Sequence, residues 1–198
     1  MKSRNWVRLF LSTLLIGAVS TIIVGFAVKW NEYKDLFLAS DIIEILLVVL
    51  WLIGVGFIFS IISQMGFFAY LTIHRFGLGL FKRVWNPVQI VLIAFVFFDL
   101  VYFRYQFFGK EGDSITPYLI IAIVILIFGL IIAYIKSKQT NKGAFIPALF
   151  FMYVVSIVEW MPAIQVNENS WFYLMLFPLL ICNAYQLLIL HKILNKKS

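Results

Sequence analysis

The charges of this chain are sorted between alternate segments, which six long apolar runs separate. The N-terminal arm and the segments after the second, fourth and sixth runs hold three cations each, so 12 of the 16 Lys and Arg residues lie there without an acid. These cations are Lys2, Arg4, Arg8, Arg75, Lys82, Arg83, Lys136, Lys138, Lys142, Lys192, Lys196 and Lys197. The other segments combine four cations with all nine acids and carry a net charge of −5. Cytoplasmic loops of membrane proteins are rich in Lys and Arg, so the pattern predicts six transmembrane spans with both termini in the cytoplasm.

The apolar runs have the lengths that transmembrane helices need. A helix requires about 20 apolar residues to cross the hydrocarbon core. The second run is longer than that and must tilt or extend into the cytoplasm. Because backbone polar groups need internal partners in lipid, we expect an all-α bundle, a single multi-pass membrane domain over 1–198. The predicted helices are 6–28, 42–70, 87–103, 117–135, 144–161 and 171–190.

Composition narrows the function classes. With 63% hydrophobic and 13% charged residues, the chain is not a soluble domain, and the lipid bilayer is its expected environment. Topology accounts for the net charge of +7, so nucleic acid is not an expected partner. Motifs of metalloproteases, P-loop proteins, serine hydrolases and thiol oxidoreductases are absent, and neither His74 nor His191 has a second ligand at metal-site spacing. The sequence therefore predicts no enzyme activity, no cofactor and no metal site.

Three acids fall within or at the ends of apolar runs, all toward the predicted outer leaflet: Glu44, Asp99 and Glu159. Arg104 follows Asp99 by about one and a half helical turns. Acids in membranes usually face the bundle interior, a partner or water. One interpretation is an outward-facing polar site formed by these four residues, which binds a cation or a small ligand. The other is that each acid is hydrated near the head groups or paired with Lys29 or Arg104.

Small residues recur every four positions in the first predicted helix, at Thr13, Gly17, Thr21 and Gly25. Such a face lets another helix backbone approach closely. The second helix has a looser stripe of the same kind, at Gly56, Ser60, Ser63 and Gly66. Packing within the chain and contact with a partner protein both fit this pattern.

The cytoplasmic segment 71–85, LTIHRFGLGLFKRVW, alternates cations with large apolar residues. Gly77 and Gly79 are expected to break any regular helix there. Cations interleaved with aromatics suit contact with head groups of the inner leaflet, and docking of a partner is the alternative. The candidate docking residues of this loop are His74, Arg75, Lys82 and Arg83.

Prolines and aromatic residues mark several helix ends. Pro87 and Pro117 are expected in first turns, where a missing N–H has no intrahelical partner anyway. Pro162 is expected just past the end of the fifth helix, and Pro178 is expected to kink the sixth. Trp160 falls at a predicted outer boundary and is expected to be an interfacial anchor.

Four blocks of the sequence together resemble one known family: RNWVRLFLSTLLIG, GFFAYLTIHRFGLGLFKRVW, FFDLVYFRY and NKGAFIPALFFMYVVSIVEWMP. They are similar to the KinB-signalling pathway activation protein family (KbaA) of spore-forming Bacillus-type bacteria. The resemblance implies an integral membrane regulator in the bacterial cell membrane. It also implies a positive role in the pathway from a membrane sensor histidine kinase to the sporulation phosphorelay.

These observations lead to one functional prediction and one alternative of a different class, and a structural or assembly factor is a third possibility close to the first. The prediction is an activator that contacts the sensor kinase, or an associated membrane protein, within the membrane. The alternative is a small solute or ion transporter, or a ligand sensor, that uses the outward-facing acidic pocket.

Overall fold

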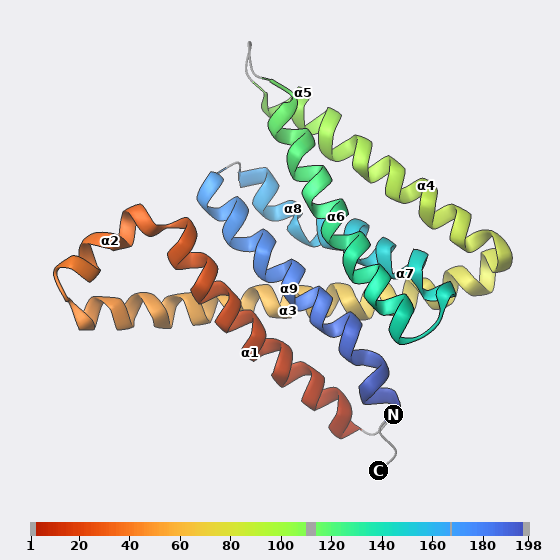
Figure 1. The fold of residues 1–198 in the computed structure, drawn as a ribbon, viewed down its shortest axis with the longest axis horizontal. Coiled ribbons are helices and arrows are strands. Elements are labelled where there is room, and N and C mark those ends of the chain that lie inside the picture. Colours follow the sequence, from red (N-terminus) through yellow and green to blue (C-terminus); the bar gives the residue numbers. More distant parts are fainter. Residues whose placement is uncertain (1–2, 110–113, 167, 196–198) are drawn as a thin grey trace. The chain divides into compact units, whose positions relative to one another are not determined.

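The computed structural model describes residues 3–109, 114–166 and 168–195. Throughout this part of the chain the secondary structure is helical and no strand occurs, which confirms the predicted all-α fold class. The α-helices, labelled in Figure 1, are α1 (Ser3–Val28), α2 (Trp30–Leu38), α3 (Ile42–Phe81), α4 (Trp85–Phe98), α5 (Arg104–Phe108), α6 (Thr116–Gln139), α7 (Phe145–Phe150), α8 (Ser156–Val166) and α9 (Asn169–Asn195). Short 3-10 turns lie at Lys82–Val84 and Lys142–Ala144, and π-helical turns lie at Asp99–Phe103 and Phe151–Val155. Several residues of the charge pattern lie outside the described residues: Lys2, Lys110, Glu111, Asp113, Lys196 and Lys197.

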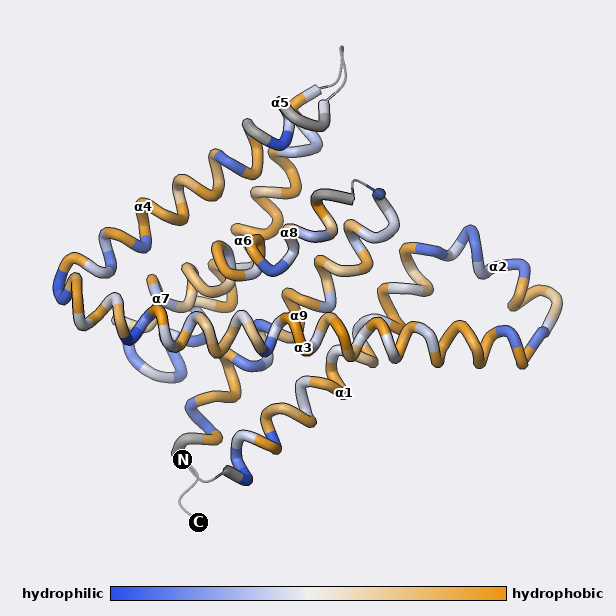
Figure 2. Tube along the Cα trace, turned by 180° about the vertical axis from the view of Figure 1, so that it is seen from behind, coloured by the Kyte–Doolittle hydropathy of each residue, from blue (hydrophilic) through white to orange (hydrophobic). Residues whose placement is uncertain are grey.

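All six predicted apolar runs are helical, and hydrophobic residues dominate the long helices while hydrophilic ones gather on α2 (Figure 2). Five helical stretches among the described residues are long and apolar enough to cross a membrane. They are Arg4–Val28, Ile42–Gln106, Thr116–Gln139, Lys142–Ile164 and Ser170–Ile193. The stretch of 65 residues contains both the second and the third predicted runs. Six crossings with cytoplasmic termini remain a prediction.

The expectation that the second helix stops at residue 70 and that glycines break the segment after it is wrong. α3 continues to Phe81, through Gly77 and Gly79. A Cβ at Gly77 would lie 2.5 Å from Trp85 Cδ2, so this glycine makes room for an indole ring against the helix. The helix ends where Lys82 adopts a positive φ of 47°, a backbone conformation that few non-glycine residues take.

The chain forms two compact units, and α3 and α8 contribute to both. The first unit comprises Met1–Phe67 and Glu159–Ser198, and the second comprises Phe68–Val158. Each unit has its own core, and each is described by itself. The single membrane domain over 1–198 remains a prediction.

In the first unit, α1 and α9 pack side by side and α3 crosses them (Figure 1). The crossing is close because small residues meet there. A Cβ at Gly17 would lie 2.8 Å from the carbonyl oxygen of Gly56, and a Cβ at Gly56 would lie 2.7 Å from Ala18 Cα. The two helix backbones touch, and only glycines allow this approach.

In the second unit, α7 packs against both α4 and α6. The π-helical turn that follows α7 is largely buried and supplies the core of this unit. Tyr70 on α3 donates a hydrogen bond to the carbonyl oxygen of Pro147 at 2.9 Å. Trp85 Nε1 donates to His74 Nδ1 at 3.0 Å, which ties the start of α4 to the end of α3.

The prolines fall partly where the sequence places them. Pro117 lies in the first turn of α6, as predicted, and Pro178 lies inside α9, which continues past it. The expectation that Pro162 lies past the end of the fifth helix is wrong, since α8 includes it and runs to Val166. Membrane helices tolerate an internal proline where neighbouring groups satisfy the freed backbone.

Candidate functional site: a buried polar network around Glu159

Four polar side chains from three helices form a hydrogen-bonded chain inside the first unit. Gln186 Nε2 on α9 donates to Ser63 Oγ on α3 at 2.6 Å. Ser63 Oγ donates to Asn183 Oδ1 on α9 at 2.6 Å. Asn183 Nδ2 donates to Glu159 Oε2 on α8 at 2.6 Å. We call Ser63, Glu159, Asn183 and Gln186 the Glu159 network.

Local helix geometry brings this network together. Asn183 and Gln186 are three residues apart and therefore share a face of α9. Ser63 and Gly66 share a face of α3 in the same way. Three members are 0% exposed, and Glu159 is 7% exposed. Polar groups buried this deeply need partners, and the chain of hydrogen bonds supplies most of them.

Gly66 makes room for the carboxylate. A Cβ on this residue would overlap Glu159 Oε1 and would lie 2.6 Å from Glu159 Cδ and 2.9 Å from Cγ. The Glu159 side chain therefore lies directly against the backbone of α3. A glycine at this position is a requirement of the network.

Several acceptor atoms in this region have no donor. Glu159 Oε1 and Gln186 Oε1 are buried without a hydrogen-bond partner, and so is the Oε1 atom of Gln64, whose amide nitrogen donates to Ser60 Oγ at 3.2 Å. Among the residues that the structure describes, the only ion pair joins Lys29 and Glu32 at 3.0 Å. The Glu159 carboxyl thus accepts a hydrogen bond from one amide, and no basic side chain of the described residues forms an ion pair with it.

Trp160 anchors α8 beside the network. Its indole Nε1 donates to the carbonyl oxygen of Phe172 at 2.9 Å, and the two rings have centroids 4.1 Å apart. The expectation of an interfacial anchor is wrong for this residue, because Trp160 is 0% exposed. It packs α8 against the start of α9.

The structure separates two acids of the predicted outward-facing site, Glu44 and Glu159. Glu44 is exposed at the start of α3, where its backbone N–H bonds to Asp41 Oδ1 at 3.1 Å. Glu159 contacts Gly66, and the residues from Glu44 to Gly66 span about 33 Å of helix. The other two candidates of this site, Asp99 and Arg104, belong to the second unit. Arg104 lies there with its guanidinium carbon 5.4 Å from the centroid of the Tyr118 ring.

The small-residue face of the first helix is used inside the chain. Thr13 and Thr21 are 0% exposed. Gly17 lies against the α3 backbone, and a Cβ on Gly25 would lie 3.0 Å from Leu52 Cδ1. All four positions are buried within the chain, and Gly17 and Gly25 lie against α3.

The candidate docking loop is the end of α3 and the turn after it. Arg75, Lys82 and Arg83 are exposed. His74 is half-buried and accepts the hydrogen bond from Trp85, so its ring helps to hold the turn. Three of the four predicted docking residues are thus available at the surface.

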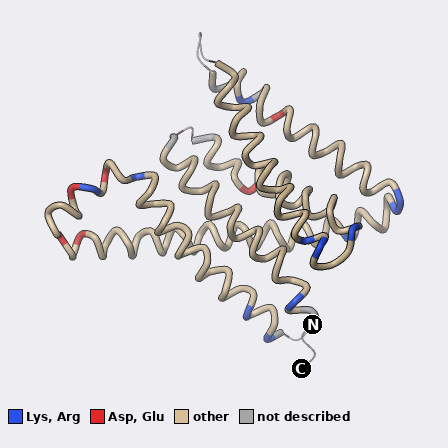
Figure 3. Tube along the Cα trace, in the orientation of Figure 1, with Lys and Arg blue, Asp and Glu red and all other residues tan. Residues whose placement is uncertain are grey.

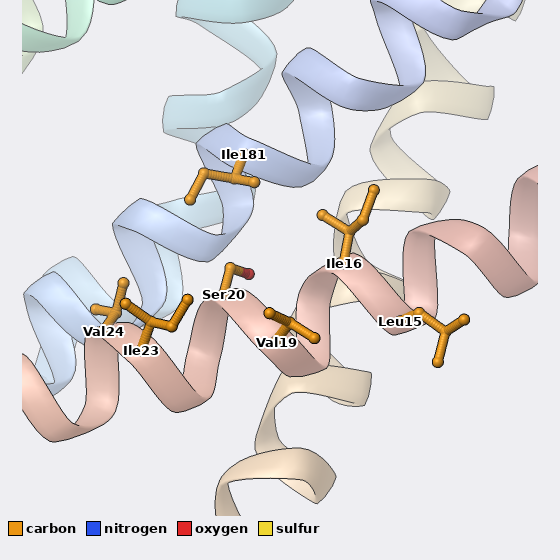
Figure 4. Close-up of a pocket in the computed structure, with 7 residues that line it drawn as sticks. All are labelled: Leu15, Ile16, Val19, Ser20, Ile23, Val24 and Ile181. Carbon is orange, nitrogen blue, oxygen red and sulfur yellow. The ribbon is translucent and has the colours of Figure 1, made fainter.

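A shallow apolar groove runs between α1 and α9 (Figure 4). Its volume is about 380 Å³. The only polar residue in it, Ser20, donates its hydroxyl to the carbonyl oxygen of Gly17 at 3.1 Å, so the groove suits apolar groups alone. The lining residues are Leu15, Ile16, Val19, Ser20, Ile23, Val24 and Ile181.

The chemistry of these features is that of polar recognition and helix packing. Among the described residues no group of three or more His, Cys, Asp or Glu side chains is placed to hold a metal ion. The thiol of Cys182 is buried in α9, 4.0 Å from the carbonyl oxygen of Thr13.

Comparison with known proteins identifies the family. Residues 17–193 match the model of the KbaA family, described as KinB-signalling pathway activation in sporulation. The chain is also 52% identical to the KinB-signaling pathway activation protein of Bacillus subtilis (strain 168), over 99% of this chain and 100% of that protein. The chain belongs to the KbaA family. No solved structure matches it.

The region that matches the KbaA family includes every member of the Glu159 network. The sequence singled out Glu159 and Ser63, but it did not single out Asn183 or Gln186. The signal that was available is a pair of amide side chains, three residues apart, inside an otherwise apolar run. Polar groups at such positions usually face the bundle interior.

Proposed function

We propose that this chain is an integral membrane regulator that positively affects the pathway of a membrane sensor histidine kinase feeding the sporulation phosphorelay. The observation that carries the proposal is membership of the KbaA family, with a 52% identical relative whose name states activation of KinB signalling. The protein acts by contact and not by catalysis.

The surface of the helices supports a place in the membrane. Large apolar side chains are exposed along the long helices, among them Leu15 at 65%, Ile23 at 65% and Val91 at 67%. Water would make this exposure unfavourable, whereas lipid tails match it. In the first unit, cations lie near the N-terminal end of α1 and the C-terminal end of α9, while acids gather on α2 and the start of α3 (Figure 3). This distribution favours the predicted cytoplasmic location of both termini.

Contact with the kinase, or with a membrane protein bound to it, takes place through the groove between α1 and α9. The exposed residues Leu15, Val19 and Ile23 recur every four positions along one face of α1 and form one wall of it. A transmembrane helix of the partner fits this surface because apolar knobs in an apolar groove gain packing contacts. Arg75, Lys82 and Arg83 add a second contact on the cytoplasmic side, with acidic groups of the same partner.

Gene deletion in the spore-forming host tests the pathway. We expect sporulation and phosphorelay output to fall in the deletion strain. The loss should not add to the loss caused by deleting the sensor kinase, since both act in one pathway. Normal sporulation in the deletion strain, or fully additive defects, contradicts the proposed function.

Two variants test the contact surface. Val19→Trp fills the groove, and Leu47→Trp is the control because Leu47 is 60% exposed on a different helix. Co-purification of the kinase complex should fall at least several-fold with Val19→Trp and should be unchanged with Leu47→Trp, at equal amounts of protein in the membrane. If both variants retain the kinase equally, lipid tails fill the groove and the contact lies elsewhere.

A further inference from the structure

Glu159 is an acid in the interior of the first unit, and no ion pair to it occurs among the described residues. The residue is 7% exposed, and its carboxylate lies against the α3 backbone at Gly66. Oxygen Oε2 accepts one hydrogen bond, from Asn183, and Oε1 accepts none. A buried negative charge needs a compensating positive charge, because the interior solvates it poorly.

The hydrogen bonds of the network run in one direction, toward the Glu159 carboxylate. Gln186 donates to Ser63, Ser63 donates to Asn183, and Asn183 donates to Glu159. Gln186, Ser63 and Asn183 each direct one donor along this chain toward the carboxylate, and Gln186 Nε2 also donates to the carbonyl oxygen of Cys182 at 3.3 Å. The oxygen atoms left over, Gln186 Oε1 and Glu159 Oε1, are acceptors, and acceptors of this kind bind a proton or a hard cation.

No other charged group of the described residues takes the compensating role. Beside Asn183 on α9 the titratable side chain is the Cys182 thiol, which is buried 4.0 Å from the carbonyl oxygen of Thr13 and supplies no positive charge. From α3 the carboxyl meets Gly66 and, through Asn183, the Ser63 hydroxyl. The one ion pair of the described residues lies at α2 and does not involve Glu159.

We propose that the Glu159 network is a binding site for a monovalent cation, either a proton or a sodium ion. The cation neutralises the carboxylate and thereby allows α3, α8 and α9 to pack at this point. Its release leaves a bare carboxylate between three helices, so the occupancy of the site controls their packing. This site differs from the outward-facing pocket predicted from sequence, since it includes Glu159 but none of Glu44, Asp99 and Arg104.

The test uses the purified full-length protein in detergent micelles and follows its thermal unfolding. Sodium chloride is compared with choline chloride at equal ionic strength and fixed pH, and pH is then varied at fixed sodium. We expect the melting temperature of the wild-type protein to change by about 5 °C or more in one of the two series. Glu159→Gln, which keeps the shape and removes the charge, should abolish that response.

The pattern of responses identifies the cation. A sodium response that is lost in Glu159→Gln assigns sodium, and a pH response that is lost in it assigns the proton. The exposed acid Glu44 supplies the matched control, so Glu44→Gln should respond like the wild-type protein. Equal responses of the wild-type protein and Glu159→Gln, or no response in either series, overturn the proposal.

A second variant covers the case in which Glu159→Gln does not fold. Asn183→Ala keeps the carboxyl and removes its hydrogen-bond donor. The midpoint of the sodium or pH response should then move at least threefold in cation concentration relative to the wild-type protein. An unmoved midpoint rules out the Glu159 network as the binding site. The experiment measures no signalling, so its result is independent of the proposed function.

Discussion

Replacing Gly66 by alanine tests the central contact of the Glu159 network. The added methyl group would overlap Glu159 Oε1 and would lie 2.6 Å from Glu159 Cδ, so the carboxyl must move. Movement breaks its hydrogen bond to Asn183, which as a charge-assisted bond contributes about 1.5–3 kcal/mol. Overpacking the interior costs about 1–3 kcal/mol more, and the better helix propensity of alanine offsets about 0.5–1 kcal/mol. We expect Gly66→Ala to lower the free energy of unfolding by about 1.5–5.5 kcal/mol.

The assay is reversible unfolding in mixed micelles, followed by tryptophan fluorescence as the fraction of denaturing detergent rises. Gly54→Ala on the same helix is the matched control, because a Cβ there meets nothing within 4 Å. This control should leave the protein as stable as the wild type or stabilise it by up to about 1 kcal/mol.

A double-mutant cycle identifies the cause of the loss. In a Glu159→Ala background the atoms that the new methyl group would meet are absent, so Gly66→Ala should cost less than about 0.5 kcal/mol. If Gly66→Ala costs the same in both backgrounds, the loss has another origin and the close approach of carboxyl and helix is refuted.

Three further substitutions probe other contacts. Gly17→Leu should prevent the close crossing of α1 and α3. It should therefore lower both the stability in the same unfolding assay and the yield of folded protein, and not only the binding of a partner. Gly77→Ala should push the indole ring of Trp85 away and destabilise the protein by about 1–3 kcal/mol in the same unfolding assay. Trp160→Phe removes the hydrogen bond to the Phe172 carbonyl oxygen. It should lower the free energy of unfolding by about 0.5–1.5 kcal/mol in the same assay.

Run length and small-residue spacing predicted much of the fold. Helix length in a membrane follows from bilayer thickness, so the six apolar runs identified six helical segments. The stripe on the second helix also predicted close contacts, and the structure gives its members different partners. Gly56 meets α1, Ser63 bonds to α9, and Gly66 lies against Glu159 of α8. The sequence indicated that this face packs but not against which helix.

The candidate site was harder to predict because a helix with the composition of a transmembrane span is apolar on both faces. In a soluble protein, periodicity separates the buried face from the exposed one, whereas lipid removes that difference. The sequence therefore did not distinguish Glu44 from Glu159, although Glu44 is exposed and Glu159 is buried. Likewise, Gly77 was expected to end a helix, and only the position of Trp85 shows that it is a packing site.

The same reasoning explains why polar side chains determine how α9 is oriented. Rotating an apolar helix about its axis exchanges contacts with lipid for contacts with protein at little cost, since both are apolar. Rotation of α9 would instead carry Asn183 and Gln186 toward hydrocarbon and leave Glu159 without its donor. Each of these groups costs free energy when it is buried without a partner. The Glu159 network therefore selects one orientation of α9 relative to α3 and α8. A change of charge at Glu159 alters the hydrogen bonds that hold this orientation.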